Sequence, residues 1–195
     1  MATPATALPL TVAEAKAHLR IEQDAEDPKL EEAIEVAVDE IASPNGWLGR
    51  SIMPQTLRLT LDAYPPRVLY LPGPPVTEVK TIKVREDDDT FTTIYDADAP
   101  TDTINLQSDL TAVPPYIWPD DDIGWPGDIK YGPDSMQVEY IAGYATADDV
   151  PKVIQRWLLM RVGELYRDPE ASLLGVKVER LSHADRMLDG WRVRR

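Results

Sequence analysis

Cysteine is absent from this chain of 195 residues, and histidine occurs only at His18 and His183. Without cysteine, neither a disulfide framework nor a thiolate metal site can form. The two histidines do not stand in the His-Glu-x-x-His spacing of zinc hydrolases. We therefore expect no metal centre of either kind.

The short motifs of nucleophilic and nucleotide-dependent catalysis are also missing. The chain has no Gly-x-Ser-x-Gly turn, no glycine-rich phosphate loop ending in Lys-Ser/Thr and no dinucleotide fingerprint. No apolar run approaches the roughly 20 residues that span a bilayer, and residues 1–10 lack the basic start of a signal peptide. We expect a protein that is not an enzyme, needs no cofactor and does not bind membranes.

Negative charge is in excess and unevenly distributed. Residues 1–151 contain 10 Lys and Arg against 28 Asp and Glu, whereas residues 152–195 contain 10 against 6. The net charges are −18 and +4. An acidic body repels DNA, so sequence-specific DNA binding is not expected. The acidity suits a surface along which DNA moves without adhering, and it equally suits a protein whose acidity only confers solubility.

Helical patterns lie at both ends of the chain. Thr11 and Glu14 fit a capping box, and Asp27-Pro28 supplies the start of a longer helix. In residues 30–41, and again in residues 154–165 and 181–191, apolar residues recur with the period of 3.6 residues that is typical of an amphipathic helix. The expected helices cover residues 11–20, 28–41, 151–166 and 182–191.

The middle of the chain has the period of two that is typical of half-buried strands. Leu57, Leu59 and Leu61 alternate with polar residues, and short β-branched or aromatic runs follow. The region 105–135, with its five prolines, is expected to be mostly loop. The expected strands cover residues 57–61, 68–71, 79–84, 91–95 and 136–140.

Together these patterns predict an α+β fold, in which N-terminal and C-terminal helices flank a small, mainly antiparallel β-sheet. Residues 1–175 are expected to form a single domain with a strand-and-loop insertion at about 55–145. Residues 176–195 are expected to form a separate C-terminal helix with a basic tail.

Two acidic triplets interrupt the strand region. Asp87-Asp88-Asp89 lies between two expected strands, as at a hairpin tip, and Asp120-Asp121-Asp122 lies in the long loop. Such carboxylates could hold Ca²⁺, although their spacing fits no EF-hand loop, and solvated turns are the other interpretation. Paired carboxylates for carbohydrate hydrolysis are a distant alternative, because their separation depends on the fold.

Several segments follow one another in the order known from one family. They are Leu10–Arg20 with an acidic turn after it, Gly49–Thr56, Leu71–Val76, Tyr140–Tyr144 and Met187–Arg192. In this order they resemble the head–tail connector (adaptor) proteins of tailed phages and phage-like gene transfer agents. Gly190-Trp191 stands where the family usually has Pro-Tyr, and the extension Val193–Arg195 is additional.

The resemblance implies a structural subunit. Connectors of this family form a ring of about twelve copies under the portal, closed by heterologous contacts, which joins capsid to tail and forms part of the DNA conduit. The implied partners are the portal protein, neighbouring copies and a tail-side stopper or tail-terminator protein, while DNA passes without specific binding. The implied location is the neck of a virion or phage-like particle, after assembly in the host cytoplasm. A tail-completion or stopper protein at the same junction is the alternative.

Three sets of residues are candidate contacts. The portal-binding set combines an aromatic anchor with arginines; it comprises Leu188, Trp191, Arg192, Arg194 and Arg195. Trp118 and Trp125 are candidates for the tail interface, and Asp87, Asp88 and Asp89 are candidates for the DNA channel. For the tryptophans, packing on the subunit's own core is the alternative interpretation.

Overall fold

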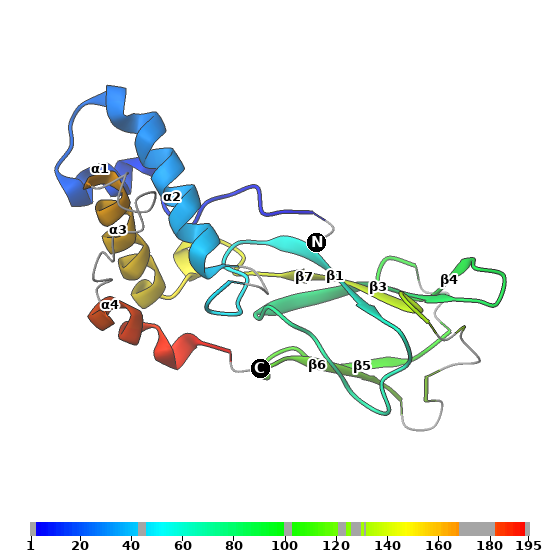
Figure 1. The fold of residues 1–195 in the computed structure, drawn as a ribbon. Helices are drawn as coiled ribbons and strands as arrows, with labels where there is room; N and C mark the ends of the chain where they lie inside the picture. The colour runs from blue at the N-terminus through cyan, green and yellow to red at the C-terminus, as the bar shows by residue number, and fades with distance from the viewer. Residues whose placement is uncertain are drawn as a thin grey trace. The chain divides into compact units, whose positions relative to one another are not determined.

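The computed structural model describes residues 3–42, 46–99, 103–120, 124–125, 130, 132–167 and 182–193 (Figure 1). The chain divides into two compact units. The strand unit comprises residues 1–6 and 54–143, and the helical unit comprises residues 7–53 and 144–195. In the sequence, the strand unit is thus an insertion within the helical unit.

The helical unit contains all the α-helices that the structure describes. The helices are α1 (Val12–Leu19), α2 (Asp27–Ile41), α3 (Lys152–Arg167) and α4 (Ser182–Met187), with 3-10 turns η1 (Asp24–Glu26), η2 (Ala147–Asp149) and η3 (Asp189–Trp191). The predicted capping box is confirmed: the Glu14 amide donates to Thr11 Oγ1 at 3.2 Å, and the Thr11 amide donates to Glu14 Oε2 at 2.8 Å. None of the described helices is long and apolar enough to cross a bilayer.

The core of the helical unit forms where the apolar faces of α2 and α3 meet. Its buried side chains from these two helices include Leu30, Ile34, Ala37, Ile41, Ile154, Trp157, Leu158 and Val162. Gly163 lets α1 approach α3, because a Cβ there would lie 3.2 Å from Leu19 Cδ2. Gly46 approaches the end of α2 so closely that a Cβ on it would lie 1.9 Å from the Ala42 carbonyl oxygen, which excludes any other residue without a backbone shift.

The strand unit consists of two antiparallel sheets. Its strands are β1 (Gln55–Leu61), β2 (Leu69–Tyr70), β3 (Val76–Arg85), β4 (Phe91–Asp96), β5 (Leu106–Asp109), β6 (Tyr116–Pro119) and β7 (Met136–Ala142). One sheet has the order β1-β7-β3-β4 and the other has the order β2-β6-β5. The predicted α+β class with mainly antiparallel strands is confirmed.

The expectation of a mostly looped region 105–135 was wrong in part, because β5 and β6 lie in it. Pro115 and Pro119 hid β6 from the sequence pattern. Pro115 precedes the strand and Pro119 is its last residue, positions at which a missing N–H is tolerated. Between them Ile117 is fully buried, while Tyr116 and Trp118 are half-buried. Strand β5, Leu-Gln-Ser-Asp, has little β-propensity and is held by pairing with β6.

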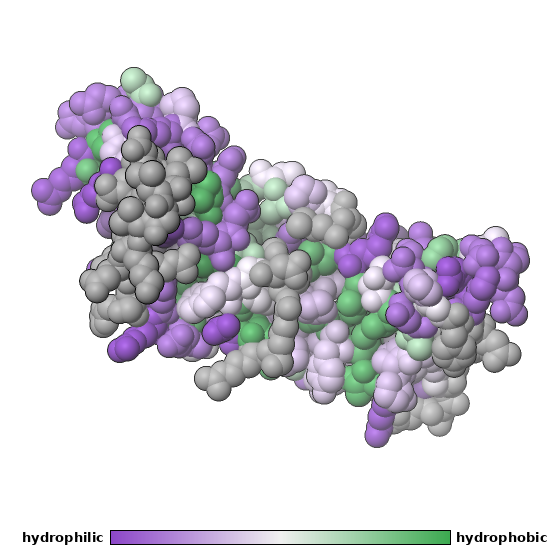
Figure 2. All heavy atoms as spheres, in the orientation of Figure 1, coloured by the Kyte–Doolittle hydropathy of each residue, from purple (hydrophilic) through white to green (hydrophobic). Residues whose placement is uncertain are grey.

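Charged and polar residues dominate the surface of the molecule that Figure 2 shows, with green apolar residues confined to small areas between them. This agrees with 34 acidic and 20 basic residues in the chain.

Tyr140 of β7 is expected to make the stability of the strand unit depend on pH in the alkaline range. The ring is buried, and its hydroxyl donates to the Pro72 carbonyl oxygen at 2.9 Å. Burial raises the pKa of Tyr140 well above that of an exposed tyrosine, about 10. The folded state therefore keeps its proton where the unfolded chain loses it. The contribution of Tyr140 to the free energy of unfolding is fully present below pH of about 10, and it is lost as the pH rises toward the pKa of the folded state.

We expect urea denaturation curves recorded at several pH values to show this loss of stability above pH of about 10. In Tyr140→Phe the alkaline slope should be shallower, at a cost near neutral pH of about 1 kcal/mol for the lost hydrogen bond. An unchanged alkaline slope in the variant would show that other groups cause the pH dependence.

Candidate functional site

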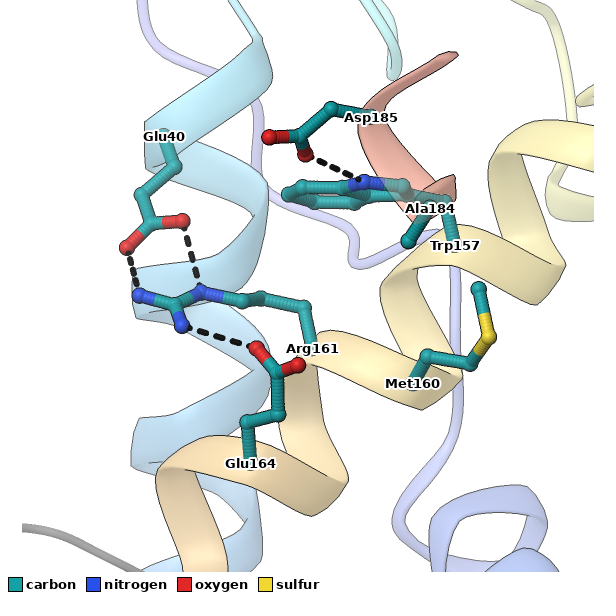
Figure 3. Close-up of a pocket in the computed structure, with 7 residues that line it drawn as sticks. All are labelled: Glu40, Trp157, Met160, Arg161, Glu164, Ala184 and Asp185. Atoms are coloured by element: carbon teal, nitrogen blue, oxygen red, sulfur yellow. Dashed lines mark hydrogen bonds and ion pairs between the residues drawn. The ribbon is translucent and has the colours of Figure 1, made fainter. Parts of the chain in front are cut away.

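The C-terminal segment, residues 182–193 with α4 and η3, packs on the other helices of its own unit. Leu188 is 0% exposed and belongs to the core of the helical unit together with Ala184. Trp157 Nε1 on α3 donates to Asp185 Oδ1 on α4 at 3.2 Å (Figure 3). The segment is therefore an integral part of the helical unit.

Beyond Leu188, the segment lies against the residues that follow α2. Arg50 Nε donates to the Trp191 carbonyl oxygen, and its guanidinium lies 5.8 Å from the centroid of the Trp191 ring. The Val193 amide donates to the Leu48 carbonyl oxygen at 3.0 Å. We call this arrangement the C-terminal seat; it comprises Trp47, Leu48, Arg50, Trp191, Arg192 and Val193.

Stacking of arginine on tryptophan occurs twice in the C-terminal seat. Besides the pair of Arg50 and Trp191, the guanidinium of Arg192 lies 5.4 Å from the centroid of the Trp47 ring. Arg50 is largely buried and also hydrogen-bonds Tyr144, whose pKa is raised by burial. Each cation–π contact contributes about 0.5–2 kcal/mol, depending on how far it is desolvated. The seat thus fixes the path of the chain up to Val193.

The structure assigns different settings to the members of the expected portal-binding set. Leu188 is fully buried in its own core, Trp191 is half-buried against Arg50, and Arg192 is exposed. Arg194 and Arg195 lie outside the described residues. Leu188 therefore anchors the segment, and the exposed edge of the seat is what a partner could touch. Binding of the portal by this set stays a prediction.

Sequence analysis missed Trp47 and Arg50 as members of this site. Arg50 and Trp191 are 141 positions apart, so no local pattern could join them. The available signal was the segment Gly49–Thr56, whose resemblance to connectors includes Arg50.

A small pocket between α2, α3 and α4 holds a network of ion pairs (Figure 3). Arg161 donates to both oxygens of Glu40, at 2.8 and 2.6 Å, and to Glu164 Oε2 at 3.0 Å. The hydrogen bond to Glu40 is the main reason why the pKa of Arg161 is raised. Both glutamates bind one guanidinium, and Asp185 binds Trp157. These contacts join α3 to α2 and to α4.

The acidic hairpin, residues 86–90 between β3 and β4, separates the three aspartates of the first triplet. Asp88 Oδ1 accepts from the Thr90 amide at 3.0 Å and from its hydroxyl at 2.6 Å, and the hydroxyl contact lowers the pKa of Asp88. Asp89 pairs with Lys130 Nζ at 2.8 Å, which lowers the pKa of Asp89.

Asp87, by contrast, is exposed and makes no hydrogen bond or ion pair with any residue that the structure describes. Asp88 keeps its negative charge, because both groups that donate to it are neutral, whereas Lys130 offsets the charge of Asp89. Asp87 differs from both in that its replacement breaks no described contact. Across the described ranges, no three acidic or histidine side chains gather as metal ligands, and Asp121 and Asp122 of the second triplet lie outside those ranges.

The two candidate tail-interface tryptophans lie in different settings. Trp125 stacks on Tyr64, with centroids 5.8 Å apart and planes at 15°, and packs against the core of the strand unit. Trp118 lies on β6 and its ring contacts Tyr116, with centroids 5.4 Å apart. The setting of Trp125 matches the interpretation of packing on its own core, whereas Trp118 remains half-buried. Contact of either residue with a tail protein stays a prediction.

Comparison with known proteins finds similarity only at the level of structure. No protein-family model and no curated protein sequence matches the chain. Among solved structures, a protein in the neck of an empty gene transfer agent (GTA) particle, computed with C6 symmetry, superposes with a TM-score of 0.73 at 21% identity. A chain in the virion of a native GTA particle gives 0.71 at 19%, and one in the neck of the native particle, computed with C12 symmetry, gives 0.67 at 19%.

In all three comparisons the match covers 100% of this chain and 97% of the other. The likeness therefore includes both units and the C-terminal segment. It confirms the resemblance to proteins of gene transfer agents at the level of the fold: this chain has the fold of a protein found in the neck of GTA particles.

Proposed function

We propose that the chain is a structural connector subunit in the neck of a phage-like or gene transfer agent particle. Copies of it form a ring under the portal, join the capsid to the tail and surround part of the DNA path. The observation that carries this proposal is the end-to-end match in fold with a GTA neck protein, at a TM-score of 0.73 over 100% of this chain.

The portal contact is proposed for the exposed edge of the C-terminal seat. Arg192 is exposed but held over the Trp47 ring, so its guanidinium is pre-positioned. Arg194 and Arg195 follow directly in the sequence. Arginine and tryptophan are enriched in interface hot spots. An arginine that is already held in place loses little side-chain entropy on binding.

The acidic hairpin is proposed to face the DNA path. A wall of carboxylates repels phosphates over roughly 8–10 Å at physiological salt, so the duplex passes without adhering. Asp87 supplies a free charge for this purpose, while Asp88 and Asp89 hold the hairpin.

The test of the connector role is binding to the portal protein of the same particle. We expect the purified protein to bind the portal, and the double variant Arg192→Glu/Arg194→Glu to bind at least about 30-fold more weakly, the loss typical of a hot spot of 2 kcal/mol. Calorimetry or surface plasmon resonance measures both. Arg20→Glu, at an exposed arginine that follows α1, is the matched control and should bind as wild type does.

Each result has one meaning. Equal binding by the double variant would move the portal contact away from the C-terminal seat. A wild-type protein that binds a tail-side neck protein but no portal would be a stopper or tail-completion protein. A protein that binds neither would overturn the proposed role.

A further inference from the structure

The sheet β2-β6-β5 exposes a row of aromatic rings on one face. Tyr70 and Tyr116 are cross-strand partners whose centroids lie 5.8 Å apart, and Trp118 is 5.4 Å from Tyr116. Tyr70 is 58% exposed. We call this surface the aromatic face; it comprises Tyr70, Tyr116 and Trp118.

The strand unit does not cover this face with its own core. The residues that alternate with the rings, Leu69 and Ile117, are buried in the core cluster. Tyr70, by contrast, is exposed. Cross-strand aromatic pairs stabilise a sheet by about 0.2–1 kcal/mol without any need for such exposure. Clustered exposed apolar residues are typical of a contact surface.

The chemistry around the aromatic face favours a cationic partner. Asp109 stands opposite Tyr116 in the β5–β6 register, and the Thr111 hydroxyl donates to it at 2.8 Å. This hydrogen bond lowers the pKa of Asp109, so the carboxylate is charged at neutral pH. The strand unit has 6 Lys and Arg against 16 Asp and Glu, a net charge of −10. Rings beside a carboxylate in an acidic unit form a site for guanidinium groups.

The helical unit carries a surface of the complementary kind. In α3 the exposed residues are Lys152, Arg156 and Arg167, all of them basic. Among the α4 residues whose side chains the structure describes, Arg186 is the exposed one. The outer surface of α3 and α4 is thus cationic, although the helical unit as a whole is not.

Resting on the proposed ring, we propose that the aromatic face of one copy binds the cationic surface of α3 and α4 on the neighbouring copy. The two surfaces are different, as a heterologous contact in a closed ring requires. Arg156 and Arg186 stack on the rings of the aromatic face, and they are attracted by the negative charge of Asp109 and of the strand unit as a whole.

The experiment measures self-association of the full chain by analytical ultracentrifugation, alone and on the portal ring, which raises the local concentration of subunits. The variants are Tyr70→Ala/Trp118→Ala and Arg156→Glu/Arg186→Glu. We expect each to self-associate at least about tenfold more weakly than wild type, equivalent to 1.4 kcal/mol. Phe91→Ala, an exposed ring of the strand unit outside the aromatic face, should associate as wild type does.

Mixing the two double variants gives the sharpest test. Each retains the surface that the other lacks, so the mixture should form heterodimers and no larger species. Because Tyr70→Ala/Trp118→Ala changes a half-buried ring, Tyr70→Ser alone is measured as well, with thermal melts to show that both remain folded.

Normal self-association by the aromatic variants would overturn this contact, as would a wild-type protein that stays monomeric even on the portal. Normal association combined with loss of tail attachment would assign the aromatic face to a tail-side protein instead. Portal binding is read separately with the wild-type protein, so failure of the connector role and failure of this contact are distinguishable.

Discussion

Leu188→Ala is expected to lower the free energy of unfolding of the helical unit by about 2–5 kcal/mol, the range for large-to-small substitutions in a packed core. Leu188 is 0% exposed and is the deepest apolar contact of the C-terminal segment. Because marginally stable domains have only about 5–15 kcal/mol in total, this is a large fraction. Urea denaturation followed by tryptophan fluorescence measures the change.

The same substitution should weaken portal binding indirectly, because Leu188 leads directly into η3 and the C-terminal seat. Val36→Ala on α2 is the control: Val36 is 42% exposed, and the change should cost less than about 0.5 kcal/mol. A loss below 1 kcal/mol for Leu188→Ala would mean that the segment is not held by its buried leucine.

Asp87→Lys is expected to reduce the DNA delivered per particle several-fold while leaving the protein folded and the ring assembled. The substitution changes the net charge of every copy by +2, and the proposed ring repeats this change around the duplex. DNA presents one phosphate charge per about 1.7 Å of axis, so a ring of lysines binds phosphates and releases counterions. Asp87 has no described partner, so its replacement leaves the hydrogen bonds of Asp88 and the ion pair of Asp89 in place.

The measurement compares packaged DNA with delivered DNA in particles that carry the variant, at two salt concentrations. Asp148→Lys makes the same charge change at an exposed residue of η2 and should deliver as wild type does. Equal delivery by both variants would show that the acidic hairpin does not face the DNA path, whatever the role of the ring.

Local chemistry made much of the fold predictable. The capping box at Thr11 and the Asp27-Pro28 start placed the first two helices, and alternation from Leu57 placed β1. Each of these signals is contained within a few residues, so no knowledge of the tertiary structure is needed. Strands β5 and β6 were not predicted, because their residues become strands only through pairing with one another and with β2.

The candidate site was less accessible to sequence reasoning, for a physical reason. A run of aspartates looks uniform in the sequence, yet the structure makes Asp88 a turn cap, Asp89 an ion-pair partner and Asp87 a free charge. Likewise Trp191 was expected as an anchor for a partner, but its nearest cation is Arg50, which the fold brings from 141 positions away. Which charge is free and which ring is stacked are properties of long-range contacts.

The way in which the strand unit is inserted has a consequence for evolution. Its first and last strands are antiparallel neighbours, with Gln55 opposite Ala142, and in the helical unit the Tyr144 amide donates to the Ile52 carbonyl oxygen at 3.2 Å. The chain therefore leaves the helical unit and returns to it at adjacent residues. The insertion of about ninety residues acts on the helical unit as a closed loop, and each doubling of loop length raises the free energy of loop closure by only about 0.6 kcal/mol. Recombination at this point can exchange one insertion for another, so related chains can acquire new surfaces while the helical unit keeps its fold.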